Sequence, residues 1–271
     1  MTPKPRGFAP LPLVATLLVA GVLVGAVIAR RSAAPTSAAV TTHGEWVRYA
    51  NANGDSVRAY VAYPERADKA PAIIVIHEIF GLTDWEPTVA DDFAKKGYLA
   101  IVPDLLSSRF GMTPASSDSG RKLVAILTPR GVITDLDATY EYVNSRPAAQ
   151  TDRVGVIGFC WGGGTVWRYA STNPKLKAAV VCYGPLADTT MLQSVQAPVL
   201  GVYGQNDARV NASLPDIIRI MKSLNKSFVA DSYPETGHGF FKPGRTGHGT
   251  SGASRAQQDV DAFLARHLEA K

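Results

Sequence analysis

The sequence has only two cysteines, Cys160 and Cys182, in 271 residues. Two cysteines do not make the disulfide framework of a small secreted domain, so the protein must rely on an ordinary hydrophobic core. The sequence also lacks internal repeats and the usual spacings of metal ligands. A site shared by His77 and His238 is the one conceivable metal site, and no ligand spacing favours it. We therefore expect no metal and no cofactor.

The chain has little net charge outside its N-terminus. The net charge is +5, and residues 1–31 contribute four positive charges and no acidic residue. The rest of the chain therefore has a net charge of only +1. A nucleic-acid-binding domain normally carries a basic stripe or patch, so we do not expect nucleic acid as a partner.

Only one long hydrophobic run is present, and it lies near the N-terminus. Residues 11–29 are uncharged and mostly apolar, with two basic residues before them and two after them. Their length suits a membrane span and exceeds the usual core of a signal peptide, although Val27-Ile-Ala29 also resembles a cleavage site. We expect residues 1–31 to be a signal anchor or a signal peptide, which would attach the chain to a membrane only if uncleaved.

The basic residues around this segment give a weak indication of its orientation. The positive-inside rule favours a soluble part outside the cytoplasm, in the periplasm or the extracellular space. A cytoplasmic domain on a reversed anchor is the alternative. A reactive thiol in an oxidising compartment is open to oxidation, and the sequence alone does not resolve this conflict.

The remainder of the chain divides into a short tether and one domain. Residues 32–43 are rich in Ala, Ser and Thr, which is typical of a flexible tether, and residues 44–271 are enough for a single domain. The domain begins with two alternating segments, 45–50 and 57–63, on either side of Asn53-Gly54. An Asn-Gly pair in this position is a strong hairpin signal, so we predict a β-hairpin there.

Short apolar segments then alternate with helix-length segments. Such alternation predicts parallel strands joined by crossover helices, and hence a mostly parallel central sheet flanked by helices. The Ser- and Gly-rich segment 107–120 is predicted to be a loop over the site. The expected strands are 72–77, 98–102, 153–159, 178–183 and 199–203, and the expected helices are 88–96, 131–144, 214–224 and 253–267.

The most informative motif is Gly158-Phe-Cys-Trp-Gly-Gly163, which directly follows the apolar run 154–157. A strand that enters a glycine-framed turn with a nucleophile at its tip is typical of the nucleophile elbow of the α/β-hydrolase fold. Small residues are needed because the turn brings the backbone close to the next helix. Cys160 stands at the tip, so we predict that its thiolate attacks a carbonyl carbon. A free cysteine is more often a small buried residue, and we expect this of Cys182.

Two further residues complete a triad in the order nucleophile, acid, base. Asp207 follows the strand-like segment 199–203, and His238 stands in the glycine-flanked loop 236–240. His238 would take the proton of Cys160 and return one to the leaving group, while Asp207 would hold the imidazole tautomer. We expect the competing acids and histidines to lie away from the site: Asp216, Asp231, His43, His248 and His267.

Three short motifs together resemble the dienelactone hydrolase family: the elbow 158–163, His77-Glu-Ile-Phe-Gly81 and Gly237-His-Gly-Phe240. The resemblance extends from about residue 45 to residue 268. In that family the glutamate of the second motif lies next to the nucleophile and helps control its ionisation, a role that the resemblance assigns to Glu78. It also implies that the backbone N–H groups of Ile79 and Trp161 form the oxyanion hole, which agrees with general hydrolase geometry.

The position of Glu78 indicates a special role independently of the resemblance. Residues 71–76 form a continuous apolar run, as expected of a strand buried on both faces, and His77 and Glu78 end it. A charge at the end of a buried strand is costly unless it is paired. A solvated loop carboxylate is the alternative for Glu78, and His77 is expected to be structural or to line the site.

The family also holds a substrate carboxylate with arginines, and here the sequence departs from the family pattern. Residues 102–109 resemble one arginine segment, with one extra residue before Arg109. Lys242 stands where the other arginine is expected, and it lacks the planar fork that grips a carboxylate; Arg245 is the alternative. All three residues are also typical of solvated surface charge. Phe240 is expected to contact substrate, with core packing as the alternative.

These observations predict a hydrolase that opens small esters or lactones, dienelactone-like, through a thioester on Cys160. A broader carboxylesterase or thioesterase is the alternative among enzymes, and a non-catalytic binding module on the same fold is the alternative outside them. No acyl-binding domain is apparent, which argues against large polymeric substrates. We expect a monomer whose partners are its small-molecule substrate and, through an uncleaved N-terminus, the membrane.

Overall fold

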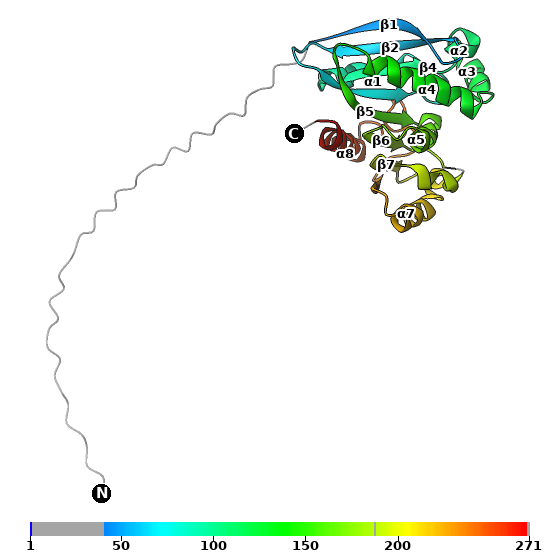
Figure 1. Ribbon diagram of the computed structural model, residues 1–271. Coiled ribbons are helices and arrows are strands. Elements are labelled where there is room, and N and C mark those ends of the chain that lie inside the picture. The colour runs from blue at the N-terminus through cyan, green and yellow to red at the C-terminus, as the bar shows by residue number, and fades with distance from the viewer. Residues whose placement is uncertain (2–40, 187, 270–271) are drawn as a thin grey trace, which may run out of the picture. The chain divides into compact units, whose positions relative to one another are not determined.

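The structure is a computed structural model that describes Met1 and residues 41–186 and 188–269 (Figure 1). The hydrophobic segment 11–29 and most of the tether lie outside the described residues, so the membrane anchor and the location of the domain stay predictions. Within the described ranges, no helix combines the length and the apolar character needed to cross a bilayer. Residues 38–271 group into one compact unit.

The described part of the chain contains one sheet of eight strands in the order β1-β2-β4-β3-β5-β6-β7-β8. β1 pairs antiparallel with β2, and β2 pairs antiparallel with β4, whereas all the other pairs are parallel. The mostly parallel sheet predicted from the sequence is therefore confirmed. The strands are β1 (Thr42–Ala50), β2 (Ser56–Pro64), β3 (Ala70–Ile76), β4 (Leu99–Asp104), β5 (Ala149–Phe159), β6 (Ala178–Cys182), β7 (Val199–Gly204) and β8 (Phe228–Tyr233).

Helices cover both faces of the sheet (Figure 1). Side chains of α1 and α8 share one hydrophobic core with the sheet, and side chains of α4, α5 and α7 share the other. This is the three-layer arrangement expected of parallel strands joined by crossover helices. The helices are α1 (Trp85–Lys95), α2 (Ser107–Phe110), α3 (Ser117–Val124), α4 (Pro129–Asn144), α5 (Trp161–Thr172), α6 (Ala208–Asn211), α7 (Leu214–Ser223) and α8 (Ser251–Leu268), with a 3₁₀ helix η1 (Thr189–Ser194).

The central strand β3 shows why its sequence is apolar throughout. Successive side chains of a strand point to opposite faces. Ile74 and Ile76 belong to the core under α4 and α5, whereas Ile73 and Val75 belong to the core under α1 and α8. Because both faces are covered, no position of β3 can be polar without burying an unpaired group.

The predicted hairpin is also present. β1 and β2 pair from Thr42 with Pro64 to Ala50 with Ser56. The turn between them includes Gly54, whose φ of 86° lies in the left-handed region that favours glycine. β1 begins at Thr42, two residues before the expected start of the domain.

Two segments differ from the sequence-based expectation. The segment 107–120 is not a plain loop, because it contains α2 and the start of α3, whose first turn is capped by the Ser116 hydroxyl. β8 was not predicted at all. It is an edge strand that pairs only with β7, and its side chains are mostly half-buried or exposed. An edge strand of this kind has no continuous apolar run, so the pattern that revealed the central strands is missing.

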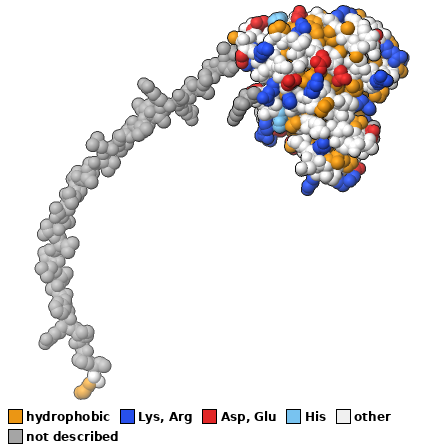
Figure 2. All heavy atoms as spheres, in the orientation of Figure 1, with side chains coloured by type: hydrophobic (Ala, Val, Ile, Leu, Met, Phe, Trp, Pro, Cys, Tyr) orange, Lys and Arg blue, Asp and Glu red, His pale blue; other side chains and the backbone are white. Residues whose placement is uncertain are grey.

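The surface of the domain carries charges of both signs. Figure 2 shows basic and acidic side chains interspersed over the visible face. This distribution agrees with the small net charge of the chain beyond residue 31.

Candidate active site

The elbow residue Cys160 has a backbone conformation that side chains rarely adopt. It lies between β5 and α5 with φ 56° and ψ −114°. The backbone packs closely at Gly162, since a Cβ there would lie 2.5 Å from the carbonyl oxygens of both Ile76 and His77. The Cys160 N–H donates to the carbonyl of Cys182 at 3.0 Å. The sheet and the glycine thus hold the thiol at the tip of a strained turn, as in a nucleophile elbow.

His238 connects the thiol to a buried carboxylate. Its Nε2 lies 3.0 Å from Cys160 Sγ, and its Nδ1 lies 2.5 Å from Asp207 Oδ2. Asp207 follows β7 and His238 follows β8, whereas Cys160 follows β5. The carboxyl ends of parallel strands meet at one edge of a sheet, which explains how residues 78 positions apart come together. Both imidazole nitrogens therefore have the partners that a nucleophile–base–acid chain requires.

The competing acids and histidines lie elsewhere. Asp216 forms an ion pair with Arg219 on the exposed side of α7, and Asp231 is exposed in β8. The other three histidines make separate contacts or are exposed: His43 pairs with Glu65, His248 is exposed, and His267 packs against Phe263 on α8.

Burial and charge keep the Cys160 thiol protonated. Burial is the largest cause of a pKa raised above its ordinary value of 9.0, and the negative charge of Glu78 is the next. A hydrogen bond from the backbone of Trp161 acts in the opposite direction, because it favours the thiolate. A thiol with a raised pKa is neutral at neutral pH, and it would need a base before it could act as a nucleophile.

Glu78 follows β3 and forms a buried ion pair. Only 3% of Glu78 is exposed, and its Oε2 lies 2.9 Å from Lys242 Nζ. The Lys242 ammonium also lies 3.5 Å from Thr83 Oγ1 and 5.1 Å from the centre of the Trp85 ring. The sequence predicted Lys242 as a partner for a substrate carboxylate. The structure instead places it on a carboxylate of the protein, where it offsets part of the cost of burying Glu78.

Glu86 is a buried residue that the sequence reading missed. It has no exposed surface, and its Oε2 accepts hydrogen bonds from the N–H and the hydroxyl of Thr83 at 2.8 and 2.6 Å. Its Oε1 accepts from the backbone N–H of Glu78 at 3.4 Å. Glu86 thus joins the loop that carries Glu78 to the first turn of α1. The signal was present, because Thr83-Asp-Trp-Glu86 has the spacing of a capping box.

Two backbone N–H groups, those of Trp161 and Ile79, are predicted to form an oxyanion hole, and this stays a prediction. The N–H of Trp161 opens α5 and bonds the sulfur of Cys160. Ile79 lies in the turn after β3, and its N–H takes part in no backbone hydrogen bond of the described residues. The His77 ring is stacked on the Trp161 ring with 5.4 Å between the ring centres, and His77 has no exposed surface. This burial favours a structural role, one of the two alternatives expected for His77.

Two of the remaining predicted substrate residues make contacts within the protein. Phe240 has no exposed surface and packs against Tyr183 and Tyr233, so it belongs to the core and offers nothing to a ligand. Arg109 is exposed on α2, and its guanidinium donates to the carbonyl of Ile126 at 3.3 Å. The burial of Phe240 favours core packing, the alternative expected for it, whereas substrate binding by Arg109 stays a prediction. Their chain positions suited the site, but the direction of each side chain depends on packing.

Arg245 stays close to the catalytic loop. Its side chain is exposed and lies beside Gly239, the residue after His238. No salt bridge among the described residues involves the Arg245 guanidinium. Within the described ranges, no cluster of three or more potential metal ligands is present.

Comparisons with known proteins agree with this geometry. A sequence model of the dienelactone hydrolase family matches residues 57–268. A Yersinia pestis protein named "Putative carboxymethylenebutenolidase" is 33% identical over 79% of this chain and 85% of its own length. An Escherichia coli K12 protein of the same name is 34% identical over 69% of this chain and 74% of its own. The crystal structure of a "Putative Dienelactone Hydrolase" from Klebsiella pneumoniae has a TM-score of 0.75 and 29% identity, and the match covers 83% of this chain and 99% of that one. The chain therefore belongs to the dienelactone hydrolase family.

Proposed function

We propose that this protein hydrolyses small esters or lactones through a thioester on Cys160. One observation carries the proposal: a cysteine at the tip of a strained elbow lies 3.0 Å from a histidine that is in turn 2.5 Å from a buried aspartate. The chain of contacts supplies the nucleophile, the base and the group that orients the base. The relatives named as carboxymethylenebutenolidases support a lactone substrate of modest size.

The reaction would begin with proton transfer from Cys160 to His238 Nε2. The sulfur then attacks the carbonyl carbon. The oxyanion of the tetrahedral intermediate accepts hydrogen bonds from the N–H groups of Trp161 and Ile79. When the carbon–oxygen bond breaks, His238 returns the proton to the leaving alkoxide. In a lactone this alkoxide stays attached to the acyl group. Asp207 stabilises the imidazolium in each transfer.

Water completes the cycle. His238 takes a proton from the water as its oxygen attacks the thioester carbonyl, and the sulfur leaves as a thiolate that regains the proton. The products are a carboxylic acid and an alcohol, joined in one molecule when the substrate is a lactone. The neutral resting thiol is protected from alkylation and oxidation, since only the thiolate reacts readily.

Glu78 and Lys242 would adjust this resting state. The Glu78 carboxylate raises the pKa of the thiol, and Lys242 pairs with that carboxylate. A substrate that carries its own carboxylate competes for Lys242 and changes the charge around Cys160. Arg245, next to the catalytic loop, is a second cation available to such a group.

Hydrolysis assays of the full chain beside its Cys160→Ala variant test the function. We would offer a dienelactone and an activated short-chain ester. Turnover of the dienelactone that the variant loses establishes lactone hydrolysis. Turnover of the ester alone keeps the thioester mechanism and assigns a broader esterase. Absence of Cys160-dependent turnover with both would refute the proposal and favour a binding module on the same fold.

A further inference from the structure

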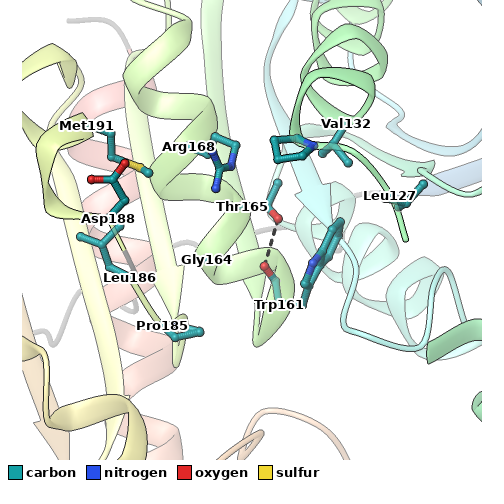
Figure 3. Close-up of a pocket in the computed structure, with 11 residues that line it drawn as sticks. Leu127, Val132, Trp161, Gly164, Thr165, Arg168, Pro185, Leu186, Asp188 and Met191 are labelled. Atoms are coloured by element: carbon teal, nitrogen blue, oxygen red, sulfur yellow. Dashed lines mark hydrogen bonds between the residues drawn. The ribbon is translucent and has the colours of Figure 1, made fainter. Parts of the chain in front are cut away.

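A small cavity lies beside the first two turns of α5 and outside the triad. Its volume is about 220 Å³. Figure 3 shows Trp161, Thr165 and Arg168 along one face of α5, with Val132 on one side and Leu186 on the other. The spacing is that of one helix face, and Gly164, between these residues, leaves the cavity open because it has no side chain. Most of the lining is apolar; Leu127, Pro129, Pro185 and Met191 complete it with Asp188.

The cavity is linked to the elbow through α5, which has Cys160 as its N-cap residue. Trp161, which lines it, directly follows Cys160, and Gly164 donates its N–H to the carbonyl of Cys160 at 3.1 Å. Pro185 lines it from the other side, two residues after Tyr183, whose ring contacts His238 at 5.2 Å between centres. The helix that carries the proposed nucleophile at its N-cap therefore also forms one wall of this apolar cavity.

Arg168 is the charged residue whose position calls for a ligand. It is half-buried, and none of the ion pairs or side-chain hydrogen bonds within the described ranges uses its guanidinium. Asp188 lines the same cavity, and its Oδ1 accepts hydrogen bonds from the N–H and the hydroxyl of Thr190 at 2.9 and 2.6 Å. These bonds are the main cause of its lowered pKa, to which the charge of Arg168 adds a smaller contribution without a salt bridge between the two residues. Among the described residues the Arg168 guanidinium has no hydrogen-bonded partner, so its N–H groups are available to a carboxylate, which a guanidinium can bind with two hydrogen bonds.

We propose that this cavity is an acyl subsite, in which Arg168 binds an anionic group at the far end of the acyl chain. The favoured substrates are esters of dicarboxylic acids of intermediate length: the ester carbonyl at Cys160, an apolar chain across Trp161 and Leu186, and a carboxylate on Arg168. Lys242, which is paired with Glu78, is not among the residues that line this cavity. It refines the proposed ester hydrolysis and depends on it for its catalytic meaning.

The helix geometry sets the length of the chain. Seven residues separate Trp161 from Arg168, which corresponds to about 10 Å along a helix axis. Helical side chains lean toward the N-terminus of their helix, so the guanidinium lies nearer to Cys160 than its own Cα does. A diacid such as adipic acid is therefore suitable, whereas a short one such as malonic acid cannot reach both groups.

A matched pair of substrates tests the subsite in the full chain. The 4-nitrophenyl monoester of adipic acid and 4-nitrophenyl hexanoate have acyl chains of equal length, and only the first carries a terminal carboxylate. The measured quantity is the ratio of their kcat/KM values. Arg168→Met keeps much of the apolar stem and should lower the ratio about tenfold, the usual cost of losing a hydrogen-bonded charge partner. Arg168→Lys should lower the ratio less, because the positive charge remains. Arg255→Met, a substitution on the exposed side of α8, should leave the ratio unchanged.

Binding gives a readout that does not require turnover. Calorimetry would measure the affinity of monoethyl adipate for Cys160→Ala and for the double variant with Arg168→Met; if the Met variant does not fold, Arg168→Gln replaces it. At least tenfold weaker binding in the double variant supports the subsite. An unchanged kinetic ratio, equal affinities, or no binding to Cys160→Ala would overturn it. Arg168-dependent binding without any turnover would keep the subsite and refute the proposed hydrolysis, so the two failures are distinguishable.

Discussion

Lys242 Nζ lies 2.9 Å from Glu78 Oε2, although the two residues are 164 positions apart in the sequence. The pair is largely buried, with side-chain exposures of 20% for Lys242 and 4% for Glu78. The same Glu78 carboxylate also raises the pKa of the Cys160 thiol. One carboxylate is thus linked both to Lys242 and to the thiol that we propose as the nucleophile.

Removing the charge of Glu78 should make Cys160 more reactive at lower pH. The negative charge disfavours the thiolate, so Glu78→Gln lowers the pKa of the thiol, and the unpaired Lys242 ammonium acts in the same direction. The rate of alkylation by iodoacetamide, measured against pH, should rise at a lower pH than in the unmodified protein. Burial still raises the pKa in the variant, because burial is the largest cause.

Glu141→Gln serves as the control for this titration, because Glu141 pairs with Lys175 on the exposed surface of α4. Its pH profile should match that of the unmodified protein. Cys182 is completely buried and should stay unlabelled throughout. A profile for Glu78→Gln that coincides with the control would show that Glu78 does not act on the thiol.

Loss of the Asp207 carboxylate should slow the reaction. Asp207→Asn removes the charge that supports the imidazolium and allows the wrong tautomer, so we expect kcat to fall about 10³-fold with little change in KM. Steady-state kinetics on the activated ester measure both. Asp231→Asn changes an exposed carboxylate on β8 and should leave the rate within about twofold. Equal effects of the two substitutions would contradict the assignment.

Gly162→Ala should destabilise the fold strongly. The new Cβ would lie 2.5 Å from two backbone carbonyl oxygens, which cannot rotate away. Overpacking of this kind costs about 3 kcal/mol. Gly131→Ala is the matched control on α4, where a Cβ meets a single side-chain atom of Thr128 at 3.1 Å. Urea unfolding followed by circular dichroism should show a much lower midpoint for the first variant only; comparable midpoints would argue against a crowded elbow.

Glu86→Ala should weaken both stability and the site. It leaves the N–H groups of Thr83 and Glu78 without their acceptors in a buried loop, which costs about 2 to 3 kcal/mol. Thermal unfolding gives the stability change, and ester kinetics show whether the Glu78 loop is still in place. Glu141→Ala, which removes an exposed ion pair, should cost less than about 1 kcal/mol. A loss for Glu86→Ala no larger than this would mean that the loop does not depend on Glu86.

Local sequence patterns were sufficient to predict the hairpin, the central strand and the elbow. Asn53-Gly54 predicted the hairpin, because few residues other than glycine tolerate the φ of 86° that the turn requires. The apolar run of β3 predicted a strand buried on both faces, and the glycines around Cys160 predicted the elbow. These features depend on steric limits within a few residues, so they can be recognised without knowing the rest of the fold.

Side-chain directions and long-range partners required the folded chain. The sequence predicted Lys242 as a partner for a substrate carboxylate, yet its side chain contacts Glu78. Phe240, two residues away, faces the core, and Arg109 faces the carbonyl of Ile126. Arg168 was not predicted, because it becomes notable only when α4 and η1 pack beside α5 and enclose its cavity. The strand order brings distant segments together, and no local pattern encodes which side chains then meet.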